Sequence, residues 1–326
     1  MGRTGIVLLG FGGPDSIESV QPFMCNLMGR VPSPELVERV CGNYDAIGGK
    51  SPLVGIATDI GSELRARLAT LGHDVEVRVG MRYWHPYIAD SLEELAGLGC
   101  DRIVTVSLSP FESKVASGAY REAIEEALRA DGGAPLEVVE APLVSELPQF
   151  AEFLADSAKV ALGTLPDTDG SLVAFTAHSL PESDLVDDDP YVAGLEETAA
   201  DVAARLGWAV GQRGVGAGLL EGFSAFGAVE GEQPWLLVYQ SKGARPGAWL
   251  GPSLDELTDA ASVADVRSLV VCPIGFMTDH METLFDLDTV AAVKAAEAGL
   301  AFVRAPVPNA DRLVVDALAD AVAPLL

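Results

Sequence analysis

The fold is decided by the stretch Leu172-Val173-Ala174-Phe175-Thr176-Ala177-His178-Ser179-Leu180-Pro181, an apolar run that ends in a histidine and a proline. A short apolar run bounded by turn residues is typical of a strand buried in a parallel sheet. A second such run, residues 269–276, ends in a glycine-containing loop and precedes Asp279-His280-Met281-Glu282. In open α/β sheets, ligands bind beyond the carboxyl ends of strands. We therefore expect His178 and Glu282 to face one crevice.

Strand-like and helix-like runs alternate along the whole chain. The strands are expected at 6–9, 75–79, 103–108, 136–139, 172–176, 235–240, 269–272 and 301–304, and the helices at 62–71, 88–96, 120–129, 191–206 and 289–298. This alternation predicts an α/β fold with parallel strands, in two similar domains over residues 1–150 and 151–308. The glycine-rich and acidic stretch 211–233 is expected to form a flexible loop or a lid.

Composition excludes several classes of protein. The chain has 326 residues and a net charge of −27, so it lacks the basic surface that binds nucleic acid, and it is not expected to adhere to anionic lipid. No run of about 18 apolar residues and no export signal is present, which predicts a cytoplasmic protein without membrane insertion. The four cysteines are widely spaced, so no zinc site or iron–sulfur cluster is expected. Nucleotide binding is disfavoured because no glycine-rich phosphate loop occurs.

Seven segments follow one another along the chain: Gly10-Phe11-Gly12-Gly13-Pro14-Asp15-Ser16, Tyr44-Asp45-Ala46-Ile47-Gly48-Gly49-Lys50-Ser51-Pro52-Leu53, Gly80-Met81-Arg82-Tyr83-Trp84, Ala177-His178-Ser179-Leu180-Pro181, Tyr239-Gln240-Ser241-Lys242, Trp249-Leu250-Gly251-Pro252 and Pro273-Ile274-Gly275-Phe276-Met277-Thr278-Asp279-His280-Met281-Glu282-Thr283-Leu284. Together, and in this order, they resemble the ferrochelatase family. The resemblance implies two Rossmann-like domains with four-stranded sheets and a porphyrin cleft between them. It also implies that a C-terminal helix, residues 309–326, returns to the first domain.

The same resemblance implies a lyase of haem biosynthesis that inserts ferrous iron into a porphyrin. Fe²⁺ and the porphyrin would be its substrates, and no tightly bound cofactor is expected. Proteins that pass haem-pathway intermediates on are conceivable partners, but their identity is left open.

The chemistry of insertion can be argued from the residues. A free-base porphyrin holds two N–H protons, so a metal enters only if a base accepts them. A neutral imidazole suits this task because its pKa, near 6.5, lies close to working pH. The family motif places His178 there and Glu282 as a second metal-site group, and imidazole with carboxylate is a plausible ligand set for Fe²⁺. We expect the two to come from loops of opposite lobes and to meet over the macrocycle. Whether His178 acts first as base or as ligand stays open.

Three residues near Glu282 in the sequence bear on the metal site. His280 is interpreted as a supporting residue rather than a third ligand. Asp286 follows Glu282 by four residues, so on an α-helix both carboxylates would share a face and could pass on a hydrated cation; alternatively, Asp286 is an ordinary exposed residue. Val290, one turn further, interrupts this acidic row.

The substrate is interpreted as coproporphyrin III, which gives Fe-coproporphyrin III (coproheme), because the chain looks like the branch of the family found in Gram-positive-type bacteria. Coproporphyrin carries four propionates and protoporphyrin two, so more donors are needed around the ring. The substrate-binding candidates by motif position are Phe11, Arg30, Tyr44, Ser51, Ser113, Tyr120 and Trp249, with Lys50, Arg82 and Lys114 as further cations. That branch carries Tyr at the position of Phe11 and Arg at the positions of Leu27 and Asn43. Phe11 cannot ligate iron.

Four alternatives stay open at this point. The first is a protoporphyrin IX ferrochelatase, and the second is a cobalt or nickel chelatase of another tetrapyrrole. The third is a haem or porphyrin carrier without turnover, against which the presence of both His178 and Glu282 argues. The fourth, a periplasmic-type binding module, would require an export signal.

Overall fold

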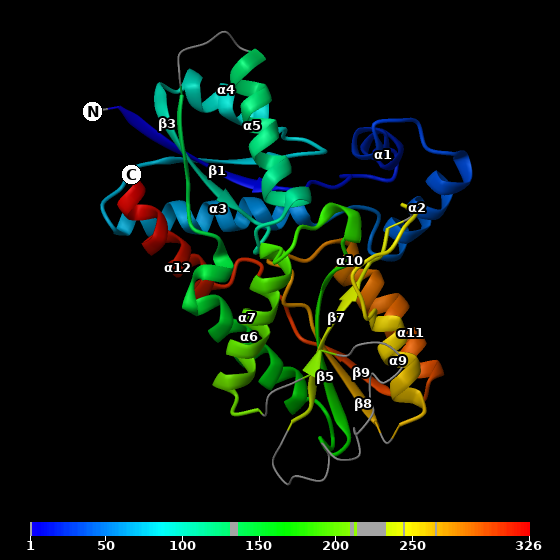
Figure 1. Ribbon diagram of the computed structural model, residues 1–326. Helices are drawn as coiled ribbons and strands as arrows, with labels where there is room; N and C mark the ends of the chain where they lie inside the picture. The colour runs from blue at the N-terminus through cyan, green and yellow to red at the C-terminus, as the bar shows by residue number, and fades with distance from the viewer. Residues whose placement is uncertain (1, 131–135, 209–211, 214–232, 244, 265) are drawn as a thin grey trace. The chain divides into compact units, whose positions relative to one another are not determined.

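The computed structural model describes residues 2–130, 136–208, 212–213, 233–243, 245–264 and 266–326. The chain divides into two compact units (Figure 1). The first unit comprises Met1–Gln149, Met277–Met281 and Pro308–Leu326, and the second comprises Phe150–Phe276 and Glu282–Val307. Most of the stretch 211–233, including 214–232, lies outside the described residues. No helix in the described part of the chain is both long enough and apolar enough to cross a membrane.

The first unit is built on a parallel sheet with strand order β2-β1-β3-β4. Its strands are β1 (Arg3–Gly10), β2 (Glu76–Met81), β3 (Cys100–Ser107) and β4 (Glu137–Glu140). Its helices are α1 (Val20–Met28), α2 (Pro34–Ala46), α3 (Leu53–Thr70), α4 (Ile88–Gly97), the π-helix η1 (Lys114–Gly118), α5 (Ala119–Ala130), the 3-10 turn η2 (Val144–Glu146), α12 (Arg312–Val322) and the 3-10 turn η6 (Ala323–Leu325). Helix α12 packs on α3, and α4 packs on α5 (Figure 1).

Helix α3 begins nine residues before the predicted start at residue 62. The hydroxyl of Ser51 accepts a hydrogen bond from the backbone N–H of Leu53, which satisfies one of the unpaired donors at this end of the helix. The helix buries Leu53, Ala57, Ile60, Leu64 and Leu68 on one side, a spacing typical of an amphipathic helix. The prediction missed this first half because Gly55 and Thr58 weaken its helix propensity.

The second unit is built on a parallel sheet with strand order β6-β7-β5-β8-β9. Its strands are β5 (Ser171–His178), β6 (Gln212–Arg213), β7 (Trp235–Gln240), β8 (Ser268–Cys272) and β9 (Ala301–Arg304). Its helices are α6 (Pro148–Gly163), which begins at the border of the first unit, the 3-10 turn η3 (Glu182–Asp184), α7 (Pro190–Arg205), α9 (Leu254–Ser262), α10 (Met281–Leu284), the π-helix η5 (Asp286–Ala291) and α11 (Ala292–Glu297).

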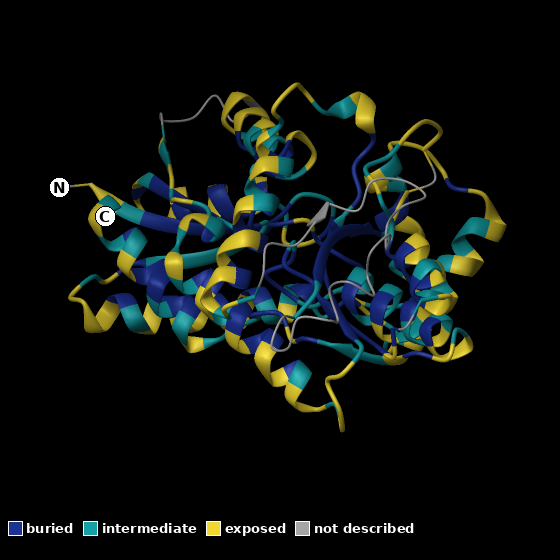
Figure 2. Ribbon diagram, turned by 60° about the horizontal axis from the view of Figure 1, so that its bottom comes forward, coloured by how far each residue is buried: buried dark blue, intermediate teal, exposed yellow. Residues whose placement is uncertain are grey.

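The α/β class with parallel strands is confirmed, but the number of strands predicted for the second sheet is wrong. Four strands were expected there, and the described residues form five, because Gln212–Arg213 pairs with Leu236 and Leu237. A two-residue strand is too short to leave an apolar pattern in the sequence. Strands β5, β7 and β8 are buried almost throughout, and they appear dark blue in Figure 2. This burial on both faces explains their continuous apolar runs.

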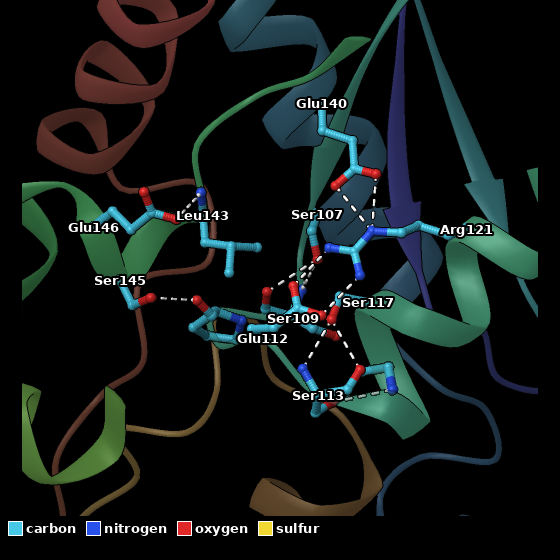
Figure 3. A network of polar contacts seen from close by, with 12 residues as sticks. Ser107, Ser109, Glu112, Ser113, Ser117, Arg121, Glu140, Leu143, Ser145 and Glu146 are labelled. Atoms are coloured by element: carbon cyan, nitrogen blue, oxygen red, sulfur yellow. Dashed lines mark hydrogen bonds and ion pairs between the residues drawn. The ribbon is translucent and has the colours of Figure 1, made fainter. Parts of the chain in front are cut away.

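A polar network ties the carboxyl end of β3 to β4 and α5 (Figure 3). The guanidinium of Arg121 donates to both carboxylate oxygens of Glu112, at 2.8 and 2.6 Å, and its Nε donates to Glu140 at 2.8 and 3.1 Å. The backbone N–H of Ser113 donates to Ser117 Oγ, and that hydroxyl donates to Ser113 O. The segment 109–118 is therefore held by hydrogen bonds within the first unit.

Replacement of Arg121 by methionine is expected to lower the free energy of unfolding by about 1 kcal/mol, since the pair is bidentate but 41% of the arginine side chain is exposed. The hydrogen bond from Arg121 holds the pKa of Glu112 below its ordinary 4.5. A lowered carboxyl pKa stabilises the fold above pH 4.5, and this contribution is lost as the pH falls through the folded-state pKa. Urea unfolding at pH 7 and pH 3 checks this.

The control is Arg129→Met, which breaks an exposed pair with Glu125 one turn away on the same helix. We expect a much smaller loss there. An equal loss in both variants, or a loss for Arg121→Met that persists at pH 3, would contradict the assignment.

Candidate functional site

His178 is the last residue of β5 and is held on three sides. Its backbone carbonyl accepts a hydrogen bond from the hydroxyl of Tyr191, at 2.8 Å, and the N–H of Ser179 donates to Gln240 O, at 2.8 Å. The ring Nδ1 lies 2.5 Å from the carbonyl oxygen of Ser179. Because a carbonyl only accepts, Nδ1 carries the hydrogen. The other ring nitrogen, Nε2, is therefore the one that can face a second group.

Glu282 meets that nitrogen. It lies in the first turn of α10, after the loop that follows β8, and its Oε1 is 3.3 Å from His178 Nε2. The two side chains are 31% and 32% exposed, so the pair is accessible without being fully solvated. The carbonyl of Glu282 accepts a hydrogen bond from the amide of Gln240, at 2.7 Å. The two side chains therefore lie together at one edge of the sheet.

The expectation that the histidine and the acid come from opposite lobes is wrong. The loop after β8 enters the first unit over Met277–Met281 and leaves it one residue before Glu282. Glu282 and His178 thus both belong to the second unit, at the carboxyl ends of neighbouring strands β5 and β8. His280 lies in the part of this loop that belongs to the first unit and is half-buried.

Asp286 lies near the site, but the backbone that positions it differs from the predicted α-helix. It begins the π-helix η5 instead of continuing an α-helix, and it is half-buried. The hydroxyl of Ser241 donates to its carboxylate at 2.5 Å. Ser241 follows β7 and has a left-handed backbone with φ of 60°, a conformation that a non-glycine residue adopts at some cost. Single turns of π-helix are frequent at functional sites. Val290, 47% exposed, follows within the same π-helix.

The electrostatics of the pair differ from those expected for an isolated imidazole. Burial acts to lower the pKa of His178, but the charge of Glu282, its hydrogen bond, the carbonyl of Ser179 and the charge of Asp286 outweigh it and raise the pKa to about 9. Burial raises the pKa of Asp286 to about 6, although the Ser241 hydroxyl acts to lower it. At neutral pH, His178 is thus an imidazolium paired with a carboxylate in the metal-free protein.

The described residues contain no group of three or more His, Cys, Asp or Glu side chains arranged to hold a metal ion. His178 and Glu282 therefore form a two-residue donor set. Such a set leaves most positions of a ferrous ion open to other ligands.

Trp249 lies on a loop that is paired with the loop carrying His178. The N–H of Leu250 donates to Leu180 O, at 2.9 Å, and the N–H of Glu182 donates to Ala248 O, at 3.0 Å. The indole N–H of Trp249 donates to Arg245 O. The guanidinium of Arg245 binds Asp184 with two hydrogen bonds, of 2.6 and 2.9 Å. Trp249 is thereby fixed relative to the loop that follows His178.

This ion pair is expected to couple the two loops measurably. A double-mutant cycle of Asp184→Asn and Arg245→Gln should give a coupling of about 0.5–1 kcal/mol in the free energy of unfolding, since Asp184 is 12% exposed but Arg245 is 57% exposed. Thermal or urea unfolding of the four proteins measures it. The matched control is the pair Asp167–Arg267, at 3.7 Å and largely exposed, for which a coupling near zero is expected. Equal couplings in the two cycles would show that the geometry of the Asp184 pair adds nothing.

Three hydroxyl candidates of the first unit are engaged internally. Ser51 caps α3, and the hydroxyl of Ser113 accepts from the N–H of Ala116 at the start of η1. Tyr120 is buried, with its hydroxyl 3.0 Å from Ser109 Oγ. Ser51 and Ser113 accept these bonds, so their O–H donors stay available to a propionate, whereas Tyr120 shares its hydroxyl with Ser109.

The remaining candidates of the first unit differ in exposure. Tyr44 is buried in a cluster with Phe23, Met24 and Trp84. Arg30 is exposed just after α1. Phe11 follows β1 and is 38% exposed.

Three residues that hydrogen-bond to the site had no predicted role. Gln240 ends β7 and Ser241 follows it, and their position at a strand end could have drawn attention to them. Tyr191 lies in α7 and contacts the His178 carbonyl, and no sequence signal pointed to it. All three hydrogen-bond to His178, Glu282 or Asp286.

Comparison with known proteins identifies the family of the chain. The family model described as Ferrochelatase matches residues 3–325. The chain is 33% identical to the coproporphyrin III ferrochelatase of Mycolicibacterium smegmatis, over 97% of this chain and 89% of that protein. It is 30% identical to the ferrochelatase of Deinococcus radiodurans, over 98% of this chain and 94% of that protein. Among solved structures, SirB from Bacillus subtilis with Fe³⁺ gives a TM-score of 0.52 at 12% identity, covers 98% of this chain and 94% of that one, and shows the fold alone. Since the family model spans nearly the whole chain, the protein belongs to the ferrochelatase family.

Proposed function

We propose that the protein inserts Fe²⁺ into coproporphyrin III to form Fe-coproporphyrin III. The observation that carries this proposal is the pair of His178 Nε2 and Glu282 Oε1, 3.3 Å apart at the carboxyl edge of a parallel sheet. Membership of the ferrochelatase family supports the reaction, and relatives named coproporphyrin III ferrochelatase support the substrate.

The charge state of the pair suggests an order of events. In the metal-free protein, Glu282 holds the proton on His178, so the imidazole cannot accept another. A ferrous ion that approaches Glu282 opposes the charge of the imidazolium and cancels the attraction that raises the pKa of His178. His178, which is partly exposed, then releases its proton to water and becomes the neutral base that a pyrrole N–H requires. This order replaces the expectation of an imidazole that is neutral from the start.

The surrounding hydrogen bonds hold His178 and Glu282 in position. The Ser179 carbonyl fixes the ring of His178 with Nε2 toward Glu282, and Gln240 fixes the backbone of Glu282. Asp286 places a further carboxylate near the pair, held by Ser241. We infer that Asp286 assists the approach of the hydrated cation, because its charge adds to that of Glu282.

The test is an anaerobic insertion assay with Fe²⁺ and either coproporphyrin III or protoporphyrin IX. The rate is measured from the loss of free-base absorbance. We expect turnover of coproporphyrin III with kcat/KM at least about tenfold above that of protoporphyrin IX, which corresponds to ~1.4 kcal/mol of discrimination. Faster turnover of protoporphyrin IX would overturn the substrate and keep the reaction. Tight porphyrin binding without insertion of any metal would indicate a carrier and overturn the reaction itself.

A further inference from the structure

Three residues of the first unit lie together at the carboxyl ends of neighbouring strands. Phe11 follows β1, and Arg82 and Tyr83 follow β2. The N–H of Arg82 donates to Gly10 O, at 2.9 Å, and the N–H of Tyr83 donates to Phe11 O, at 3.0 Å. Ligands of open α/β sheets bind beyond this edge. The group therefore stands where the fold is suited to hold a small molecule.

The aromatic part of this group is rigid and partly open. The rings of Phe11 and Tyr83 lie with centroids 4.7 Å apart, at an angle of 57°. The amide of Asn26 donates to the Tyr83 carbonyl, at 3.3 Å, and to the Tyr87 hydroxyl, at 2.7 Å. Phe11 is 38% exposed, although its side chain is apolar. A fixed, exposed aromatic ring suits a flat apolar ligand.

Arg82 adds a cation to this group, and no described residue pairs with its guanidinium. Its guanidinium carbon lies 5.2 Å from the centroid of the Tyr83 ring, which is the geometry of a cation–π contact. It forms no ion pair among the described residues, and its buried Nε has no hydrogen-bond partner. Arg82 is half-buried. Six other cations without an ion pair among the residues whose burial is described are exposed, namely Arg30, Arg39, Lys50, Lys114, Lys159 and Lys242.

This lack of a carboxylate partner is informative because acidic side chains are abundant. The chain has 48 Asp and Glu residues against 21 Lys and Arg residues, so an arginine that needed only a partner for stability would find one readily. Stacking on Tyr83 occupies the face of the guanidinium and leaves its N–H edge free. That edge matches a carboxylate with two parallel hydrogen bonds.

We propose that Arg82 binds a propionate carboxylate of the porphyrin while Phe11 contacts the apolar part of the macrocycle. This inference rests on the proposed function, since it assigns a subsite for the same substrate. The geometry thus gives Arg82, one of the further cations of the sequence, a specific carboxylate to bind.

The test is binding of metal-free coproporphyrin III, measured by its fluorescence at several NaCl concentrations. Arg82→Met keeps an unbranched stem on Tyr83 and removes the charge, and it should raise Kd roughly tenfold at low salt. Arg82→Lys keeps the charge and should fall between that variant and the wild type. Arg39→Met, which removes an exposed arginine without an ion pair from α2, is the matched control and should bind like the wild type.

The salt series separates a charge effect from a packing effect. We expect added NaCl to weaken binding by the wild type and to narrow its difference from Arg82→Met. Wild-type affinity in Arg82→Met, or equal losses in Arg82→Met and Arg39→Met, would overturn the inference. Equal losses in Arg82→Lys and Arg82→Met that salt leaves unchanged would overturn it as well. If the wild type neither binds coproporphyrin III nor inserts iron into it, the proposed function fails instead.

Discussion

Replacement of His178 by alanine should reduce the rate of iron insertion by roughly 10²–10⁴-fold, the range that a positioned general base contributes. The reason is local, since Nδ1 of His178 is bound to the backbone and Nε2 is the ring nitrogen that faces Glu282. Binding of free-base porphyrin should be largely unchanged, because the substitution removes no carboxylate-binding group. Anaerobic single-turnover assays measure the rate, and fluorescence titration measures the binding.

The control for this variant is His73→Ala, which removes a half-buried histidine of the first unit. It should insert iron at the wild-type rate. Normal turnover by His178→Ala would remove the basis of the proposed function, and equal losses in the two variants would show that the assay reports on folding.

Replacement of Glu282 by glutamine separates charge from shape at the same site. Insertion should slow severely, because the amide neither attracts the cation nor ligates it as a carboxylate does. The metal-free protein should also change in its pH dependence of stability. The raised pKa of His178 stabilises the wild-type fold below pH 6.5, and this stabilisation is lost as the pH rises through about 9. In Glu282→Gln, the unfolding midpoint should vary less over this interval.

The parts of the fold that could be predicted are those with a long apolar pattern. Strands β5 and β8 are buried on both faces, so their runs stand out in the sequence, and the residues after them, His178 and Glu282, could be placed at one edge. Strand β6 and the start of α3 were missed for the opposite reason, because a two-residue strand and a glycine-containing helix leave little signal.

The site itself was predictable in its reacting groups and not in their environment. The spacing of Glu282 and Asp286 predicts that both lie on one face of an α-helix, but the chain forms a π-helix from Asp286 onward. The residue pattern alone does not distinguish the two kinds of helix. The pKa of His178 depends on a contact between residues more than a hundred positions apart. The contact of the Tyr120 hydroxyl with Ser109 likewise leaves no signal in the sequence.

Gly275 allows the loop after β8 to lie directly against the end of β5. A Cβ atom placed on Gly275 would lie 2.5 Å from the Cβ of Ala177 and 2.7 Å from its Cα. The N–H of Gly275 also donates to Thr176 O, at 3.0 Å, so the two backbones are in register. Real Cβ atoms essentially never approach so closely, and the contact is with backbone, which cannot rotate away. Strand and loop must therefore separate in Gly275→Ala.

We expect Gly275→Ala to lower the free energy of unfolding by about 1–3 kcal/mol, the usual cost of overpacking a filled interior. Iron insertion should fall further than stability explains, by roughly 10²-fold, because the shift acts on the residue that precedes His178 and on the loop that leads to Glu282. Urea unfolding and single-turnover insertion, measured well below the unfolding midpoint, separate the two effects.

The matched control is Gly163→Ala in the same unit, where an added Cβ meets no atom within 4 Å. It should leave both measurements close to those of the wild type. The double variant Ala177→Gly with Gly275→Ala removes the 2.5 Å contact but keeps the 2.7 Å contact with the Cα of residue 177, so it should recover only part of the rate. Full activity in Gly275→Ala would mean that the ends of β5 and β8 tolerate separation, and that the 3.3 Å approach of His178 to Glu282 does not limit insertion.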